Sequence, residues 1–138
     1  MNIAVRYYTR SGNTRKLAEA IGKAVGVQAL DVSAQLTEKT DILFLGSSVY
    51  AADIDDAVKE FLEKNSTHIG KIVNFSTAAI ARSTYQQVKK CADRLGIAMS
   101  EEEFHCKGSF AILHKNRPNE EDLNKATFFA KEIVKKCK

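Results

Sequence analysis

Two hydrophobic patterns alternate along the chain. A short apolar and aromatic run at Ile3–Tyr8 has the composition of a strand. After the polar stretch Ser11–Thr14, apolar residues recur at helical spacing and share one face of the predicted helix: Leu17, Ile21, Ala24 and Val25. Gly26 then supplies a helix stop. The chain is therefore predicted to begin with a strand, a polar loop and a helix.

The same alternation continues to the end of the chain. Further strands are predicted at residues 27–32, 42–46, 71–76 and 103–113, the last of them interrupted by Gly108. The run 42–46 is apolar without alternation, which is typical of a strand covered on both faces. Helices are predicted between the strands, with apolar stripes within residues 54–62, 88–95 and 123–134. We expect Asp53 to cap the first of these three helices and Pro118–Asn119 to open the last.

This pattern predicts an α/β fold of three layers. Five strands alternate with about four helices, and strands joined by helical crossovers form a parallel sheet with helices on both faces. The chain has no internal repeat and no linker, so we predict a single domain over residues 1–138. Such doubly wound sheets bind ligands at the carboxyl ends of their strands. The loops to consider are therefore 9–14, 47–53 and 77–83.

Composition excludes several classes of protein. The 138 residues are 44% hydrophobic and 28% charged, as in an ordinary globular domain. No run is long enough to span a membrane, and the N-terminus lacks a signal-peptide pattern. Cys91, Cys106 and Cys137 are too few and too scattered for a disulfide framework or a zinc site. We therefore expect a cytoplasmic protein with reduced thiols and no metal.

The net charge of +4 is distributed in patches. No dense run of lysine and arginine occurs, and basic residues are not interleaved with aromatic ones as in nucleic-acid-binding surfaces. We therefore expect no nucleic-acid partner and at most a modest preference for anions.

The loop Thr9-Arg10-Ser11-Gly12-Asn13-Thr14 has the composition of a phosphate site. Hydroxyl and amide side chains surround a predicted helix start, where backbone N–H groups lack partners and the helix dipole is positive. Gly12 lets the backbone approach an anion closely. The simpler alternative is that Ser11 or Asn13 only caps the helix. Because the loop follows the first strand of an alternating sheet, we favour the phosphate site.

The residues around this loop also carry a recognisable order. The order is an apolar residue (Val5), an aromatic residue (Tyr7), a hydroxyl residue (Thr9), a glycine (Gly12), a threonine (Thr14), an alanine (Ala18) and an aliphatic residue (Ile21). In this order the chain resembles the flavodoxin family. Arg6 departs from the pattern, which has an apolar or aromatic residue there, so its charge must reach the end of the sheet or pair with another group.

The resemblance implies strand order 2-1-3-4-5 and FMN as a non-covalent cofactor. Its phosphate would lie on the loop formed by Thr9, Arg10, Ser11, Gly12, Asn13 and Thr14. The flavin ring would lie against the loop that follows the third strand, where Tyr50 can stack and small neighbours admit backbone contacts, at Ser48, Val49, Tyr50 and Ala51. A second wall would be formed by Thr77, Ala78 and Ala79, a loop without an aromatic or an acidic residue.

The function that the resemblance implies is electron transfer between redox partner proteins, with no catalytic residue. We expect a monomer or weak dimer without membrane insertion. The acidic side chains that follow the third strand, Asp53, Asp55, Asp56, Glu60 and Glu63, are most simply a solvated helix face, or a docking patch for a basic partner. Two alternatives stay open: a small FMN-dependent oxidoreductase, like a protoporphyrinogen oxidase or a quinone reductase, and a binding module of the same fold without flavin.

Overall fold

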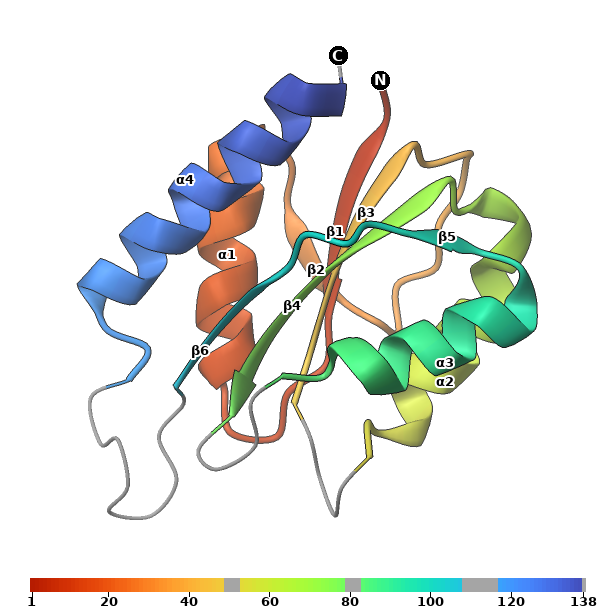
Figure 1. The fold of residues 1–138 in the computed structure, drawn as a ribbon, viewed down its shortest axis with the longest axis horizontal. Coiled ribbons are helices and arrows are strands. Elements are labelled where there is room, and N and C mark those ends of the chain that lie inside the picture. Colours follow the sequence, from red (N-terminus) through yellow and green to blue (C-terminus); the bar gives the residue numbers. More distant parts are fainter. Residues whose placement is uncertain (49–52, 79–82, 108–116, 138) are drawn as a thin grey trace.

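Strands and helices alternate along the chain as the hydrophobic pattern predicts (Figure 1). The computed structural model describes residues 1–48, 53–78, 83–107 and 117–137. The strands are β1 (Ile3–Tyr7), β2 (Ala29–Asp31), β3 (Ile42–Ser47), β4 (Lys71–Ala78), β5 (Ala98–Met99) and β6 (Phe104–Lys107). The helices are α1 (Asn13–Val25), α2 (Asp56–Asn65), the short 3-10 helix η1 (Ser66–His68), α3 (Tyr85–Leu95) and α4 (Glu120–Cys137).

The strands form one parallel sheet. Its order is β2-β1-β3-β4-β5, and β6 also pairs with β4. The predicted order 2-1-3-4-5 is therefore confirmed. The carboxyl ends of β1, β3, β4 and β6 lie together at one edge of the molecule, while the N-terminus and the end of α4 lie at the opposite edge (Figure 1).

The fifth position of the sheet is divided between two short strands. β5 pairs with the start of β4 through Lys71↔Ala98, and β6 pairs with its end, from Phe75↔Phe104 to Ala78↔Lys107. The hydrophobic pattern predicted only the second of these, as part of a strand over 103–113. The two-residue strand β5 is too short to show a periodicity, so the sequence analysis missed it. Residues 108–113 of the predicted strand lie outside the described residues.

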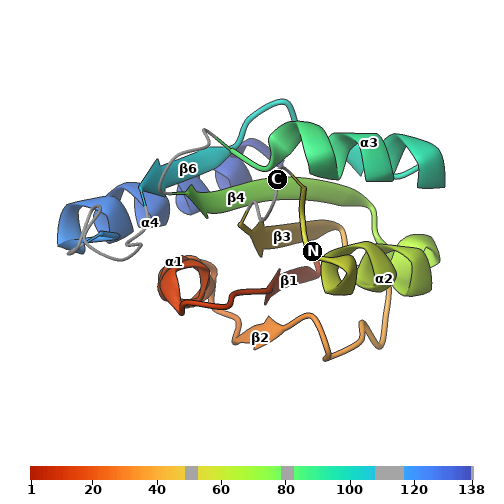
Figure 2. The same cartoon turned by 90° about the horizontal axis from the view of Figure 1, so that it is seen from below.

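Helices cover both faces of the sheet. Figure 2 shows α1 and α4 on one side and α2 and α3 on the other. Each side has its own hydrophobic core, with Leu17 and Phe44 in the first and Leu45 and Phe61 in the second. Every residue of β3 is buried, which agrees with the absence of alternation in its sequence.

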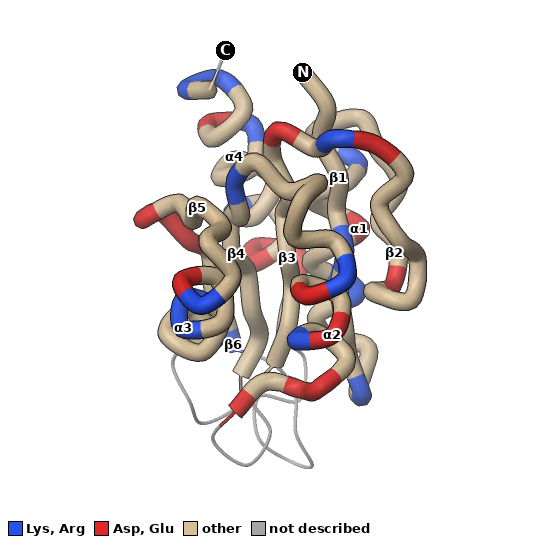
Figure 3. Tube along the Cα trace, turned by 90° about the vertical axis from the view of Figure 1, so that its right-hand side faces the viewer, with Lys and Arg blue, Asp and Glu red and all other residues tan. Residues whose placement is uncertain are grey.

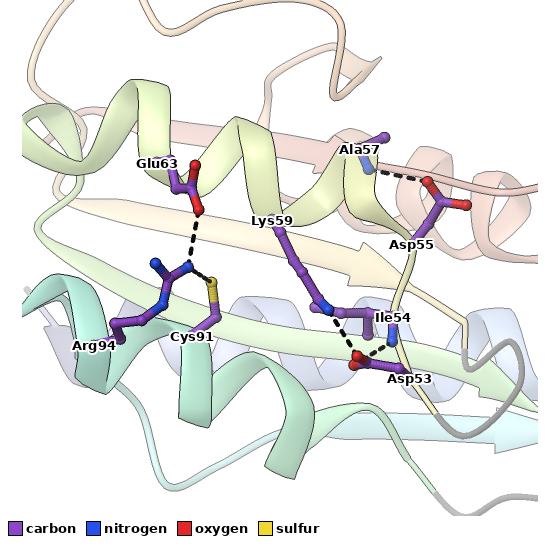
Figure 4. A network of polar contacts seen from close by, with 8 residues as sticks. All are labelled: Asp53, Ile54, Asp55, Ala57, Lys59, Glu63, Cys91 and Arg94. Atoms are coloured by element: carbon purple, nitrogen blue, oxygen red, sulfur yellow. Dashed lines mark hydrogen bonds and ion pairs between the residues drawn. The ribbon is translucent and has the colours of Figure 1, made fainter.

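The start of α2 differs from the prediction in its capping residue. α2 is capped by Asp55, whose side chain accepts a hydrogen bond of 2.9 Å from the Ala57 N–H, and the expectation that Asp53 caps it is wrong (Figure 4). Asp53 instead accepts from the Ile54 N–H and pairs with Lys59 at 2.7 Å. Both aspartates precede the helix, and only the backbone turn decides which one faces its free N–H groups.

Arg6 finds its partners in backbone carbonyl groups. Although it lies in the middle of β1, its side chain donates to Ala34 O at 2.9 Å and to Val5 O at 3.1 Å. A third donor reaches Gln35 O. Burial lowers the pKa of Arg6, yet an arginine stays charged in proteins. The loop between β2 and β3 thus satisfies the charge that departs from the family pattern.

The close packing of β3 and β4 predicts a sensitive position at Gly46. The ring of Phe75, its neighbour in register on β4, covers this glycine, and a Cβ built there would lie 2.2 Å from the ring. We expect Gly46→Ala to lower the free energy of unfolding by about 1–3 kcal/mol because the buried ring has no room to move. Urea denaturation followed by circular dichroism measures this. Lys131→Ala on the exposed side of α4 is the control, and equal stability of the two variants would contradict the packing argument.

Candidate functional site

Three hydroxyl groups from three loops meet at the carboxyl edge of the sheet. Thr14 Oγ1 lies 2.8 Å from Ser48 Oγ and 2.9 Å from Thr77 Oγ1, and the last two are 3.2 Å apart. They come from the start of α1, the end of β3 and the end of β4. All three residues are buried. We call this arrangement the hydroxyl cluster.

The N-terminus of α1 stands next to the hydroxyl cluster. Its N-cap is Gly12 in the left-handed conformation with φ 90°, so the cap residue has no side chain to occupy the free N–H groups. The Gly12 N–H donates to Thr9 Oγ1 at 2.9 Å, and the Asn13 N–H donates to Ser11 Oγ at 3.4 Å. The first turn contains no acidic residue. Gly12, rather than Ser11 or Asn13, is the N-cap residue, and the Ser11 hydroxyl accepts the N–H of the first residue of α1.

These features together suit an anion. Hydroxyl and backbone N–H groups are hydrogen-bond donors without charge, and the helix dipole adds a partial positive charge in the same place. A buried hydroxyl can turn its hydrogen toward a ligand while its oxygen still accepts from a neighbour. The hydroxyl cluster and the start of α1 therefore form a candidate phosphate cradle.

Arg10 connects two of the loops. Its guanidinium lies 2.7 Å from the Asp55 carboxylate, the residue that caps α2. The N–H of Ala57 and the guanidinium of Arg10 hold the pKa of Asp55 below its ordinary value. Hydrogen bonds to Asp55 and to Tyr8 raise the pKa of Arg10. The side chain of Arg10 is 56% exposed, so this pair bridges the loops at the surface.

The structure describes nine of the thirteen predicted site residues. They are Thr9, Arg10, Ser11, Gly12, Asn13, Thr14, Ser48, Thr77 and Ala78; Val49, Tyr50, Ala51 and Ala79 lie outside the described residues. It brings Thr14, Ser48 and Thr77 into contact, although they are far apart in the sequence. The sequence analysis missed Asp55 as the partner of Arg10, because an aspartate in an acidic run gives no signal for a partner 45 residues away.

Other chemistry has little support in the described part of the chain. No cluster of metal-ligating side chains occurs there, and none of its helices has the length and apolar character that crossing a membrane requires. Cys91 is buried in the core. Burial raises the pKa of Cys106 to about 12, so its thiol is protonated at neutral pH and is a poor nucleophile.

Comparison with known proteins identifies the family. Residues 4–136 match a family model described as a flavodoxin domain. The chain belongs to the flavodoxin domain family. A relative from Methanocaldococcus jannaschii, named as uncharacterized protein MJ0298, is 33% identical over 136 residues, which cover 89% of this chain and 91% of the relative.

Solved flavodoxins share the fold of this flavodoxin domain. A flavodoxin from the domain Archaea superposes with a TM-score of 0.80 at 18% identity, covering 99% of this chain and 98% of the other. Oxidised flavodoxin 1 from Bacillus cereus gives a TM-score of 0.75 at 19% identity, covering 98% of each chain.

The hydroxyl cluster predicts a measurable contribution to the stability of this flavodoxin domain. Thr14→Val keeps the shape of the side chain but removes the hydroxyl between Ser48 and Thr77. We expect it to lower the free energy of unfolding by about 1–3 kcal/mol, since two buried hydroxyls each lose a partner. Urea unfolding measures this. The control is Thr67→Val on the exposed 3-10 helix, and an equal effect of both variants would show that the cluster adds nothing to stability.

The cap and ion pair of Asp55 predict a pH dependence. Because the pKa of Asp55 is lowered by folding, its contribution is present above the unfolded pKa of about 4 and is lost as the pH falls through the folded pKa. At pH 7, Asp55→Ala should cost about 1 kcal/mol. Asp55→Asn should cost less because its amide oxygen can still accept from the Ala57 N–H, and its stability should fall less than that of the wild type between about pH 5 and pH 2.

Unfolding curves across this pH range test the assignment. Glu60→Gln on the solvated face of α2 is the matched control for removing one carboxylate. If the pH profile of Asp55→Asn is as steep as that of the wild type, Asp55 is not the group that produces the dependence.

Proposed function

We propose that this flavodoxin domain binds FMN without a covalent link and carries electrons between redox partner proteins. The observation that carries the proposal is the hydroxyl cluster, in which the start of α1 and the ends of β3 and β4 supply adjacent hydroxyls. Membership of the flavodoxin domain family supports a flavin mononucleotide as the ligand that such a cradle holds.

The residues present fit a terminal phosphate. The candidate donors are the side chains of Thr9, Ser11, Asn13, Thr14, Ser48 and Thr77 and the first N–H groups of α1. Residues 9–14 contain no lysine, the side chain that reaches the phosphates in P-loop proteins. Such a cradle holds a phosphate without activating it, as expected where the phosphate serves only as an anchor.

In this proposal the protein supplies position and environment. Bound FMN would supply reversible one- and two-electron chemistry, and the surrounding groups would set its potential. Thr77 belongs to the phosphate cradle, and Thr77 and Ala78 are the described part of the predicted second wall. The same strand end would therefore orient both the phosphate and the ring. No residue of the cradle acts as an acid or a base.

The acidic residues near α2 give limited support to docking of a basic partner. Figure 3 shows acidic segments at the start of α2, beside the carboxyl edge. Their charges are partly neutralised, because Asp53 pairs with Lys59, Asp55 pairs with Arg10, and Glu63 pairs with Arg94. Electron transfer through this face would depend on the remaining carboxylates of Asp56 and Glu60.

A comparison of FMN with riboflavin tests the proposal. The purified protein should be yellow, and after removal of the flavin it should bind FMN at least about tenfold more tightly than riboflavin, which lacks the phosphate. Thr14→Val should weaken FMN binding about tenfold and leave riboflavin binding unchanged. Quenching of flavin fluorescence measures both affinities, with Thr67→Val as the control.

The same measurements separate the alternatives. A colourless protein that does not bind added FMN would favour a binding module without flavin. Equal affinities for FMN and riboflavin would contradict the phosphate cradle. Reduction of the bound flavin by NAD(P)H, or its oxidation by a quinone, without a partner protein would favour a small oxidoreductase over an electron carrier.

A further inference from the structure

A cavity separate from the phosphate cradle opens between the end of β6 and the start of α4. Its volume is about 290 Å³, at the lower end of the range for small-molecule sites. Among the described residues, those that line it are Ala78, Phe104, His105, Cys106, Lys107, Arg117, Asp122 and Lys125. We call this cavity the β6–α4 cleft. None of its cationic side chains takes part in the phosphate cradle.

Positive charge dominates the β6–α4 cleft. Lys107, Arg117 and Lys125 contribute three positive charges and Asp122 one negative charge, which gives a formal balance of 3 − 1 = +2, with His105 left out of the count. Lys107 forms no ion pair with another described residue. Lys125 lies 3.1 Å from Glu121, but both side chains are well exposed, and such pairs exchange partners at little cost.

The single carboxylate of the cleft is already engaged. Asp122 accepts two hydrogen bonds from Arg117, at 2.5 and 2.6 Å, and a third from the Asn119 N–H at 2.8 Å. Burial opposes the ionisation of Asp122, but these donors outweigh it and hold its pKa below the ordinary value. The charge of Asp122 is thus used within the protein, and Lys107 and Lys125 are left to meet a ligand.

Ala78, Phe104 and Cys106 form an apolar part of the cleft wall, beside His105. Phe104 packs on Phe129 of α4 with ring centroids 5.9 Å apart, which fixes its position. Cys106 is protonated, so it presents a neutral sulfur, and Ala78 presents a methyl group. A ligand that satisfies both walls needs a flat or compact apolar body and an anionic group at one end.

We propose that the β6–α4 cleft binds a small organic anion, an apolar ring bearing a carboxylate, with the carboxylate held by Lys107 and Lys125. Ala78 lines the cleft, pairs in register with Lys107 and directly follows Thr77 of the hydroxyl cluster. A ligand in the cleft would therefore lie beside the flavin. This placement rests on the proposed function, whereas the binding of the anion does not.

Benzoate and its neutral counterpart benzamide are suitable probes. Titration of the nitrogen-15-labelled, FMN-free chain with benzoate should give saturable amide shifts at Ala78, at residues 104–107 and at Asp122, and benzamide should give none. Lys107→Gln and Lys125→Gln should each weaken benzoate binding about tenfold. Lys131→Gln, which removes a lysine from the exposed surface of the same helix, should leave it unchanged.

The outcomes separate the two proposals. Absence of saturable shifts, equal shifts with benzamide, or an unaltered affinity in both cleft variants would overturn the cleft proposal whether or not FMN binds. With FMN bound, benzoate should also perturb the visible absorption of the flavin. If FMN binds and benzoate leaves this absorption unchanged, the placement beside the flavin is wrong. If FMN itself fails to bind, the proposed function is overturned and the amide shifts still decide the cleft.

Discussion

The contact among the hydroxyls of Thr14, Ser48 and Thr77 determines the geometry of the functional edge. Each hydroxyl can donate once and accept from its neighbours, so three of them satisfy one another inside the protein without a ligand. Because they belong to three segments that are distant in the sequence, this contact holds the start of α1 and the ends of β3 and β4 together before anything binds. In the proposed function, an anion would meet hydroxyls that are already in place, which would reduce the conformational cost of binding.

The sheet makes this contact possible. β3 is buried along its whole length, and its glycine, Gly46, lets the Phe75 ring of β4 lie close against it. Ser47 and Ser76 are neighbours in register, and the residue that follows each of them, Ser48 or Thr77, belongs to the hydroxyl cluster. The buried Arg6 connects β1 to the loop between β2 and β3, because its side chain donates hydrogen bonds to carbonyl groups of that loop. Packing in the middle of the sheet thus positions the hydroxyl cluster at its carboxyl edge.

Near the carboxyl edge of the sheet, acidic side chains are engaged within the protein. Asp55 caps α2 and pairs with Arg10, and Asp122 pairs with Arg117. Much of the negative charge of both aspartates is therefore compensated within the protein. The candidate phosphate cradle offers hydroxyls and helix N–H groups, and the β6–α4 cleft offers Lys107 and Lys125. Both sites are therefore suited to anions, one without formal charge and one with it. A neutral cradle fits a permanently held phosphate, and exposed lysines fit a ligand that exchanges.

The sequence by itself determined the alternation of strands and helices and the three-layer class, because helical and strand periodicities are local properties that each segment carries alone. The strand order followed from the resemblance to a family, and the division of the fifth position between β5 and β6 had no signal in the sequence. It also identified residues 9–14 as a candidate loop, since Gly12 and its hydroxyl neighbours adjoin a strand and a helix. Only the tertiary structure decided that Asp55 rather than Asp53 caps α2, that Arg10 pairs with Asp55, and that Thr14 meets Ser48 and Thr77. The β6–α4 cleft was likewise absent from the sequence analysis. These contacts join residues distant in the chain or depend on a backbone turn, and no local pattern records which side chains parallel pairing brings to the same edge.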